Sequence, residues 1–510
     1  MKKKITKSLT AVALVLSLLT ACSSGGGAEP TVSPNSTSNQ EKGSTASETK
    51  QPIKIEIVQD GTVQFPENDF IKKALLDKLN IDLTMTVEPT EYISKLNTRV
   101  AGGNFPDLMI LDKNQAQKYS ESGALLDFGP YMDKLPDYVS FLGEEELKKG
   151  LFQGEQYTLP KIAGKPTGTY WIRKDWLDAL GLPMPTTIDE LFKVAKAFTE
   201  NDPDKNNKKD TFGITGTELN TFAPVFGAYG LVNSGSYLIK DNKLSNALYD
   251  PAMKDALAEV KRFIDAGVVD PEFLSNKTNV AKDKAFQGKF GIIYEGWSGI
   301  VKADAKKVWK DANPNTEWTQ LGALTGPSEK SYVSGVEMAG WLQLLAVPKN
   351  MEKDPEKLNK ILELINYVST EEGNLLVSYG IKDEHFTIDN GKVTITDKGK
   401  AESGFTFVYQ FTGRKDEKYL VAKFSEQAEY IEYELGLPRV GIADGYVVPP
   451  TGFNKADADR FVKEEFSEFL YGKKSLDQYD QFLKTLEDSF QYKMYTESVE
   501  TQVKELGLIK

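Results

Sequence analysis

The stretch Ile53-Lys54-Ile55-Glu56-Ile57 begins the part of the chain that decides the fold. Apolar and charged side chains alternate strictly there, which is typical of a β-strand. Apolar residues then recur at helical spacing over 70–79, alternation returns over 81–87, a second helical pattern covers 91–101, and 108–111 is a short apolar run. Strand, helix, strand, helix, strand predicts parallel βαβ units, and therefore an α/β fold.

Polar side chains stand just past two of these predicted strands. Asp60 follows the first strand, and Asp112 and Asn114 follow the third. Ligands of open α/β sheets bind outside the carboxyl ends of the strands. We therefore predict that these three side chains belong to a ligand site.

The N-terminal segment has the features of an export signal. Three lysines at 2–4 precede an apolar run over 11–19, and Leu19-Thr20-Ala21-Cys22 supplies a cleavage site of small residues. Cys22 is the only cysteine of the chain, and the four residues resemble the bacterial lipobox. We predict a signal peptide at 1–21, a lipidated Cys22, and a flexible polar linker over 22–51. An ordinary signal peptide with a chance cysteine is the alternative.

Composition narrows the functional classes. The 510 residues carry a formal net charge of −12, which disfavours nucleic acid as a partner and leaves the lipid anchor as the predicted membrane attachment. With Cys22 lipidated, the body has no thiol for catalysis or metal binding. His385, the only histidine, is predicted to lie in a surface loop. We therefore predict a binding protein without catalytic residues, although a pair of carboxylates among so many remains an alternative.

A polar loop following a predicted helix has the spacing of a calcium site. Oxygen ligands are expected from Asp202, Asp204, Asn206, Asp210 and the backbone carbonyl of Lys208, because Ca²⁺ loops present alternate residues inward. Asn207 stands where such loops have glycine, and Gly213 stands where they have a bidentate glutamate. The alternative is a solvated polar loop. The expected role of the ion is structural.

Aromatic residues beside polar groups are candidates for a carbohydrate site. Sugars offer an apolar CH face and a rim of hydroxyls, so their pockets combine aromatic rings with charged or amide partners. The alternative is that these rings are core residues, and Trp171 is expected to face away from Tyr170 in the same strand. A further, weaker candidate set is Glu426, Tyr430 and Tyr433. The predicted carbohydrate-binding residues are Tyr170, Arg173, Tyr294, Glu295, Trp297 and Trp341.

Several motifs together resemble the family 1 bacterial extracellular solute-binding proteins of ABC sugar importers. The sequence is most similar to the sugar-binding lipoprotein branch and to alginate-binding proteins. The motifs are the lipobox at Cys22, Gly103-Asn104-Phe105-Pro106-Asp107-Leu108, Tyr157-Thr158-Leu159-Pro160, Trp171-Ile172-Arg173-Lys174-Asp175-Trp176-Leu177, the loop of 202–210 with Thr211-Phe212-Gly213, and Tyr294-Glu295-Gly296-Trp297.

The resemblance implies an α/β, two-lobed periplasmic-binding-protein-like fold with a hinge and a central ligand cleft. It implies crossing segments near 165–172, 290–297 and 335–342. The expected N-lobe is 52–168 plus 292–336, and the expected C-lobe is 169–291 plus 337–510. It also implies calcium at the 202–210 loop, a sugar platform at Trp297, and an acidic residue in alginate-binding relatives where this chain has Thr211.

The function expected from these features is that of a monomeric, lipid-anchored receptor on the outer face of a bacterial cell membrane. It would bind a carbohydrate, expected to be an oligosaccharide, and deliver it to the permease subunits of an ABC importer. The alternatives are an exported glycan-degrading enzyme that uses carboxylates and a peptide-binding lipoprotein.

Overall fold

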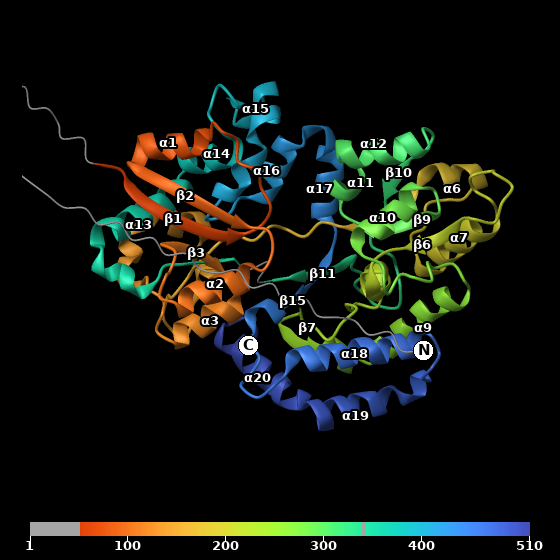
Figure 1. Ribbon diagram of the computed structural model, residues 1–510. Helices are drawn as coiled ribbons and strands as arrows, with labels where there is room; N and C mark the ends of the chain where they lie inside the picture. Colours follow the sequence, from red (N-terminus) through yellow and green to blue (C-terminus); the bar gives the residue numbers. More distant parts are fainter. Residues whose placement is uncertain (1–50, 339–342) are drawn as a thin grey trace, which may run out of the picture. The chain divides into compact units, whose positions relative to one another are not determined.

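The computed structural model describes residues 51–338 and 343–510 of the chain (Figure 1). The predicted signal peptide, the lipidation site Cys22, nearly all of the predicted linker, and Trp341 lie outside the described residues. None of the helices in the described ranges is long and apolar enough to cross a membrane.

The described residues form strands and helices in alternation. The strands are β1 (Ile53–Asp60), β2 (Ile81–Glu88), β3 (Leu108–Leu111), β4 (Leu159–Pro160), β5 (Thr169–Arg173), β6 (Phe212–Thr215), β7 (Tyr237–Lys240), β8 (Lys243–Asn246), β9 (Phe290–Glu295), β10 (Trp318–Gln320), β11 (Ser334–Glu337), β12 (Leu344–Ala346), β13 (Phe386–Asp389), β14 (Lys392–Ile395) and β15 (Arg439–Ile442). The helices of the first half are α1 (Phe70–Leu79), α2 (Tyr92–Ala101), α3 (Lys113–Glu121), α4 (Pro136–Leu142), α5 (Glu144–Leu147), α6 (Lys174–Leu180), α7 (Ile188–Glu200), α8 (Ala223–Ala228) and α9 (Ala252–Asp265). Those of the second half are α10 (Thr278–Phe286), α11 (Trp297–Ile300), α12 (Ala303–Ala312), α13 (Pro355–Ser369), α14 (Glu371–Tyr379), α15 (Asp397–Glu402), α16 (Asp416–Lys423), α17 (Ala428–Gly436), α18 (Lys455–Leu470), α19 (Tyr479–Phe490) and α20 (Tyr492–Glu505).

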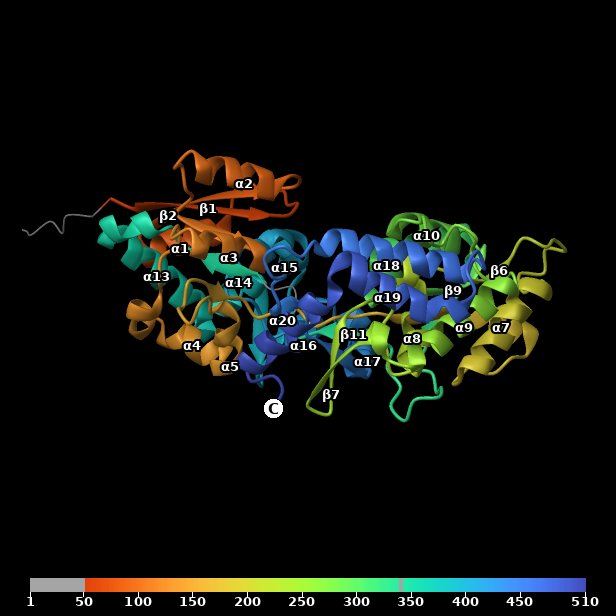
Figure 2. The same ribbon diagram turned by 90° about the horizontal axis from the view of Figure 1, so that it is seen from below.

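The first sheet has the strand order β2-β1-β3-β12-β4. β1 pairs in parallel with β2 and β3, so the predicted parallel βαβ units are confirmed. β12 enters from far along the chain and runs antiparallel to β3 and β4. Alternate residues of β1 serve opposite faces: Ile55 and Ile57 pack with α1, α4 and α13, whereas Val58 packs with α2 and α3. Figure 2 shows α2 on one side of the strands and α4 and α13 on the other.

The second sheet has the order β10-β5-β9-β6. β5 runs antiparallel to both β9 and β10, and β6 runs parallel to β9. Tyr170 and Ile172 face a core shared with α6, α7 and α9, whereas Trp171 faces a separate cluster with α10, α11, α12 and α17. The expected opposite orientation of Tyr170 and Trp171 is therefore confirmed.

The two sheets define two lobes, but the expected boundaries were wrong for the second halves. β9 and β10 pair with β5, so 292–336 belongs to the second sheet and not to the lobe of the first. β12 pairs with β3, and the core of the first lobe includes residues between 345 and 411, so this segment does not belong to the second lobe. Residues 290–297, an expected crossing segment, are consequently a strand inside the second sheet followed by a helical turn.

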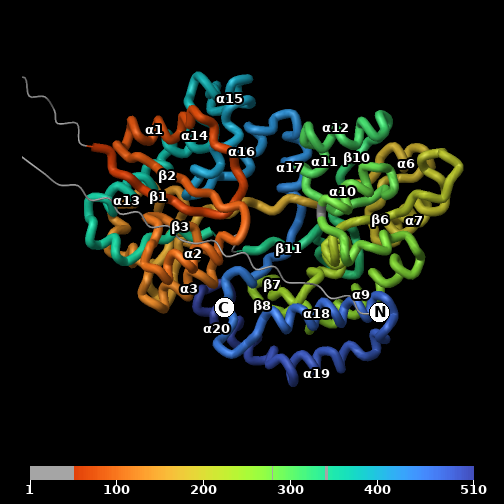
Figure 3. The backbone as a smooth tube through the Cα atoms, in the orientation of Figure 1, coloured from red at the N-terminus to blue at the C-terminus, as the bar shows by residue number. Residues whose placement is uncertain are grey.

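A chain segment directly after β4 links the first sheet to β5, as the tube in Figure 3 shows. A third sheet has the order β11-β15-β7-β8, and its β7 and β8 lie between β6 and β9 of the second sheet in the chain. The C-terminal part of the chain forms α18, α19 and α20, whose apolar residues join the core of the second lobe. β13 and β14 pair with each other as an antiparallel hairpin.

Candidate functional site

The predicted polar residues at the edge of the first sheet are exposed. Asp60 is the last residue of β1, and Asp112 follows β3 directly. Asp112 is the N-cap of α3, and its carboxylate accepts a 2.9 Å hydrogen bond from the backbone N–H of Gln115. Asn114 is exposed in the first turn of the same helix. The edge therefore presents two carboxylates and one amide to solvent.

Lys161 lies near both Asp60 and Arg414, and no local sequence pattern predicts this arrangement. Burial, followed by the charge of Arg414, lowers the pKa of Lys161 to about 8, and the Asp60 carboxylate opposes this shift. The pairing of the backbone N–H of Ile162 with the carbonyl of Thr412, at 3.0 Å, brings the two segments together. Arg414 donates to Asp416 at 2.7 Å and to Gln410 at 2.9 Å.

Strand β9 of the second sheet ends at a half-buried acidic residue. Glu295 is the last residue of β9, and burial raises the pKa of its carboxyl, while a 3.0 Å hydrogen bond from the backbone N–H of Gly296 opposes the rise. The neighbouring Tyr294 is also half-buried, with its ring edge-to-face against Tyr170 at 6.3 Å. These residues combine an aromatic ring with a carboxylate, as the sequence interpretation required.

Trp297 begins α11 and is held by a residue that the sequence interpretation missed. Its backbone N–H donates to the Glu434 carboxylate at 3.0 Å, and its ring lies 5.0 Å from that of Phe424. Only 4% of Trp297 is exposed, so its role as a sugar platform stays a prediction. Tyr430, one of the weaker candidates, stacks on Trp171, whereas Tyr433 is exposed.

Glu434 is fully buried and accepts hydrogen bonds from four segments. Its Oε1 accepts from the indole N–H of Trp171 at 3.1 Å and from the Gln320 amide at 2.9 Å. Its Oε2 accepts from the backbone N–H groups of Gly168 at 2.9 Å and Trp297 at 3.0 Å. Burial raises its pKa, and these donors oppose the rise. The side chain ties α17 to the linking segment, to two strands and to α11.

Two predicted ligand residues are wrong, because the structure places them in the core. Tyr170 is fully buried, and its hydroxyl donates to the carbonyl of Thr221 at 2.7 Å. Arg173 is 2% exposed, forms two hydrogen bonds with Asp175, and lies over the Trp176 ring at 4.5 Å. Both lie within β5, where neighbouring strands cover them on both sides.

A separate contact joins α3 of the first lobe to the second lobe. Lys113 donates to the backbone carbonyl of Tyr446, and burial lowers the pKa of Lys113 to about 8. The ammonium of Lys149 lies 5.6 Å from the centre of the Tyr446 ring, and the Tyr446 hydroxyl donates to the carbonyl of Met338 at 3.1 Å. Lys113 and Lys149 of the first lobe thus both contact Tyr446 of the second lobe.

In the loop over 202–210, three carboxylates accept hydrogen bonds from Asn206. The side-chain N–H groups of Asn206 donate to Asp204 at 2.7 Å and to Asp210 at 3.1 Å, and the backbone N–H of Asn206 donates to Asp202 at 3.1 Å. Asn207 has φ of 61°, as a residue in the glycine position of a calcium loop requires. Burial raises the pKa of Asp204, with further increases from Asp202 and Asp210.

Packing explains two departures of this loop from a complete calcium-binding pattern. A Cβ at Gly213 would lie 2.7 Å from the Cβ of Ala195 and 2.8 Å from the carbonyl oxygen of Val268, so a glutamate does not fit there. Thr211 is buried, and its hydroxyl donates to the carbonyl of Phe198 at 2.8 Å, away from the carboxylates. Within the described residues, no three acidic, histidine or cysteine side chains form a ready metal site.

His385 is not the surface histidine that the sequence predicted. It is 1% exposed, and its ring stacks on Phe70 with centroids 4.2 Å apart. Its Nδ1 accepts a 3.0 Å hydrogen bond from the backbone N–H of Ile381. The preceding Asp383-Glu384 suggested exposure, but the turn folds the ring inward against α1.

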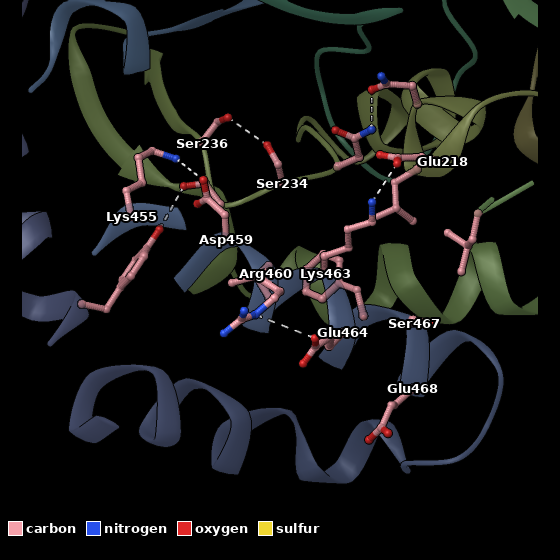
Figure 4. Close-up of a pocket in the computed structure, with 18 of the residues that line it drawn as sticks. Glu218, Ser234, Ser236, Lys455, Asp459, Arg460, Lys463, Glu464, Ser467 and Glu468 are labelled. Carbon is pink, nitrogen blue, oxygen red and sulfur yellow. Dashed lines mark hydrogen bonds and ion pairs between the residues drawn. The ribbon is translucent and has the colours of Figure 1, made fainter. Parts of the chain in front are cut away.

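A cavity of about 860 Å³ lies beside α18, and Figure 4 shows its polar lining. Lys463 pairs with Glu218 at 2.7 Å, and Lys455 pairs with Asp459 at 2.6 Å. Ser234 and Ser236 lie 2.8 Å apart on the opposite side. Of the predicted ligand residues that the structure describes, none lines this cavity, and its charges are largely paired with each other.

The comparisons identify the class of protein. The model of the bacterial extracellular solute-binding protein family matches residues 66–375, and the chain belongs to this family. The lipoprotein LipO of Bacillus subtilis (strain 168) is 26% identical over 414 residues, which cover 78% of this chain and 77% of LipO. The polygalacturonan/rhamnogalacturonan-binding protein YtcQ of the same organism is 28% identical over 335 residues, 63% of this chain and 64% of YtcQ.

Solved structures agree on the two-lobed fold. An HMO-binding, ABC-transporter-associated solute-binding protein from Bifidobacterium longum infantis superposes with a TM-score of 0.71 at 18% identity, covering 90% of this chain and 100% of that chain. The alginate-binding protein AlgQ2, in a structure without calcium ion, superposes with a TM-score of 0.62 at 18% identity, covering 89% of this chain and 99% of that chain. The predicted family and fold class are therefore confirmed.

Proposed function

We propose that this protein is a lipid-anchored receptor that binds an oligosaccharide between its two lobes and delivers it to an ABC importer. The proposal rests on the polar and aromatic residues that lie at the ends of strands in each sheet. In the first sheet, Asp60 ends β1, and Asp112 and Asn114 follow β3. In the second sheet, Tyr294 and Glu295 end β9, and Trp297 begins the helix that follows it. These residues supply carboxylate, amide and aromatic groups, which together suit a hydroxylated ring.

The linking segment supports a hinge between the lobes. Gly168 donates its backbone N–H to Glu434, and its carbonyl accepts from Arg439 at 2.7 Å. Closure of the lobes around the ligand would produce the form that permease subunits recognise, as in other hinged receptors. Lobe closure would also bring Lys161 and Asp60 against the ligand. The relatives support the ligand class, since YtcQ is by its name a polygalacturonan/rhamnogalacturonan-binding protein.

The lipid anchor at Cys22 belongs to the same proposal. LipO is a lipoprotein, and the basic, apolar and small-residue order at 1–22 of this chain fits export and lipidation. The anchor would hold the receptor on the extracellular face and raise its effective concentration near the permease. Mass spectrometry of the membrane-extracted protein tests this, since Cys22→Ser would remove the diacylglycerol mass and release the protein into the medium.

We also propose that the 202–210 loop binds a structural calcium ion. The side chains of Asp202, Asp204, Asn206 and Asp210 and the backbone carbonyl of Lys208 would supply hard oxygen ligands. Their fit rests on the crowding of three carboxylates around the Asn206 amide and on the left-handed backbone of Asn207. Bound calcium would neutralise these carboxylates and fix the turn between α7 and β6.

A thermal-shift screen tests the proposed function. The purified full chain is heated with neutral oligosaccharides, acidic oligosaccharides and peptides, and each sugar is analysed for cleavage afterwards. Ligand that binds only the folded state raises Tm, by roughly the equivalent of 2.7 kcal/mol at a hundredfold excess over Kd. A sugar that raises Tm and is recovered intact supports the proposal. Sugar cleavage, or a response to peptides alone, would overturn it.

Site variants sharpen the same test. Asp60→Ala is expected to weaken sugar binding by about tenfold through loss of a charged hydrogen-bond acceptor. Asp77→Ala is the matched control, because Asp77 is an exposed carboxylate on α1 whose only ion pair among the described residues is with Lys73. Equal affinity of both variants for the sugar would exclude Asp60 from the site.

A further inference from the structure

A groove of about 1040 Å³ runs between α4, α14, the β13–β14 hairpin and α16. Its lining reverses the charge balance of the chain, which has 62 lysines and arginines against 74 acidic residues. We call this feature the cationic groove. It is lined by the cations Lys392, Lys400, Arg414, Lys415 and Lys418 and by the carboxylates Asp137 and Glu371.

Three of the cations have no carboxylate partner among the described residues. Lys392, Lys415 and Lys418 are exposed and form no ion pair there, and only Lys415 has a ring contact, 5.7 Å from the centre of Phe141. Unpaired charges of one sign in a concave surface add their fields at the same place. On a protein of net charge −12, the groove is therefore a local site of attraction for anions.

The floor of the groove is aromatic and rigid. Tyr379 and Tyr419 stack with centroids 5.6 Å apart and an interplanar angle of 29°. The guanidinium of Arg414 lies 4.1 Å from the centre of the Tyr419 ring. Arg414 is fixed in turn by its hydrogen bonds to Asp416 and Gln410. Tyr379 and Tyr419 are only 6% and 5% exposed, so the floor holds the Arg414 cation in place and offers little free ring surface to a ligand.

One wall of the groove is set by a tight turn. The β13–β14 hairpin reverses at Asn390 and Gly391, both with positive φ, of 49° and 78°, and asparagine followed by glycine favours this turn. The turn places Lys392 directly opposite Asp389 in the register of the hairpin. Lys415 and Lys418, at the start of α16, belong to another wall. The lysines thus come from separate rigid elements.

We propose that the cationic groove is a second carbohydrate site that binds the acidic, uronate-type segment of an oligosaccharide. Each uronate unit has one carboxylate, so a segment of three units offers one carboxylate to each of the three lysines. The apolar CH faces of the units suit Phe141, Val393 and Val421, which are partly exposed in the lining of the groove. Charge-assisted hydrogen bonds from lysine to carboxylate are stronger than neutral ones. A neutral sugar would leave the three lysines unmatched, and a flat anionic surface would not enter a concave groove.

The cationic groove is separate from the proposed ligand site between the lobes. None of Asp60, Asp112, Asn114, Tyr294, Glu295 and Trp297 lines it. The inference can therefore be tested independently of the proposed function. A second site of this kind would capture a long acidic glycan at one point while the lobes bind another part of the chain, which raises the effective concentration of the glycan at the receptor.

Calorimetric titration of the full chain with trigalacturonic acid, and with neutral galactotriose as the comparison, tests the inference. We expect trigalacturonic acid to bind, with affinity that falls as salt is raised because exposed charges are screened. The combined variant Lys392→Glu, Lys415→Glu, Lys418→Glu should weaken binding by at least about tenfold. The milder variant with glutamine at the same three positions should lose part of the affinity and answers any concern over folding.

The control is the combined variant Lys306→Glu, Lys353→Glu, Lys484→Glu, which changes the net charge equally at exposed lysines that form no ion pair with described residues. Retained affinity in this control, with loss in the groove variant, supports the inference. Four outcomes would overturn it: unchanged affinity in the groove variant, equal loss in the control, an equal loss of galactotriose binding in the groove variant, or lysine-dependent binding to phosphatidylglycerol vesicles without any binding of trigalacturonic acid.

Discussion

The carboxylate of Glu434 accepts the backbone N–H of Trp297 at 3.0 Å, although 137 residues separate the two in sequence. The same oxygen accepts from Gly168, at the end of the segment that links the lobes. One buried side chain therefore positions both a predicted sugar platform and the start of β5. Removal of a charge acceptor from such a place leaves several buried donors without a partner.

Glu434→Gln should destabilise the folded protein by about 2–4 kcal/mol. The glutamine amide keeps one acceptor oxygen and replaces the other with an N–H₂ donor. This donor group would point at two N–H donors, so at least two of the four hydrogen bonds are lost. Urea unfolding followed by circular dichroism measures this. Glu432→Gln, an exposed residue on the same helix, is the control and should change stability by less than about 0.5 kcal/mol. Similar stability of both variants would show that the four hydrogen bonds contribute little.

Calcium should raise Tm, and a chelator should lower it to the ion-free value. Asp202→Ala and Asp210→Ala should each remove most of the calcium response, because each deletes a hard oxygen ligand. Differential scanning calorimetry with and without calcium measures the shift. The control is Asp488→Ala, an exposed carboxylate on α19 without an ion pair among the described residues. A chelator-insensitive Tm for the unmodified chain contradicts the calcium proposal.

Gly213→Ala should destabilise the protein by about 2 kcal/mol or more, because the added methyl group meets Ala195 and the carbonyl of Val268 at distances under 3.0 Å. The variant thus tests why the loop lacks a glutamate at this position. Denaturant midpoints measure the loss. Gly404→Ala is the matched control, since a Cβ there meets nothing within 4 Å. Equal midpoints for the two variants would show that β6 can shift to accept a side chain.

The sequence was sufficient where structure depends on near neighbours. The period-two and helical patterns between 53 and 111 predicted β1, α1, β2, α2 and β3, because each pattern is complete within a few residues. The Asn207 backbone was predictable for the same reason, since a loop of this spacing needs a residue that tolerates positive φ.

The sequence was insufficient where long-range pairing decides the outcome. β12 joins the first sheet by pairing Leu344 with Leu111, and nothing local distinguishes it from a strand of the other lobe. Arg173 had the polar character of a site residue, but flanking tryptophans and Asp175 enclose it. Glu434 was missed because its partner Gly168 lies 266 residues away. Only the assembled fold shows which polar residues are buried.

Asp444 should make stability depend on pH in the acid range. Burial raises the pKa of its carboxyl to about 6, although the backbone N–H of Tyr237, which donates to it at 2.7 Å, opposes the rise. Because the folded state binds this proton more tightly than the unfolded state, the contribution to stability is fully present below the unfolded pKa of about 4 and is lost as pH rises through about 6. The loss should amount to about 1–3 kcal/mol between pH 4 and pH 7.

Urea midpoints from pH 4 to pH 7 measure this contribution. Asp444→Asn keeps an acceptor for Tyr237 and removes the titrating group, so its stability should fall less than that of the unmodified chain as pH rises across this range. Asp488→Asn, on exposed α19, should follow the unmodified chain. Parallel profiles for all three proteins would show that Asp444 titrates alike in the folded and unfolded states. A flatter profile for Asp444→Asn alone assigns the pH dependence to this carboxyl beside the α18 cavity, where Asp444 is among the lining residues.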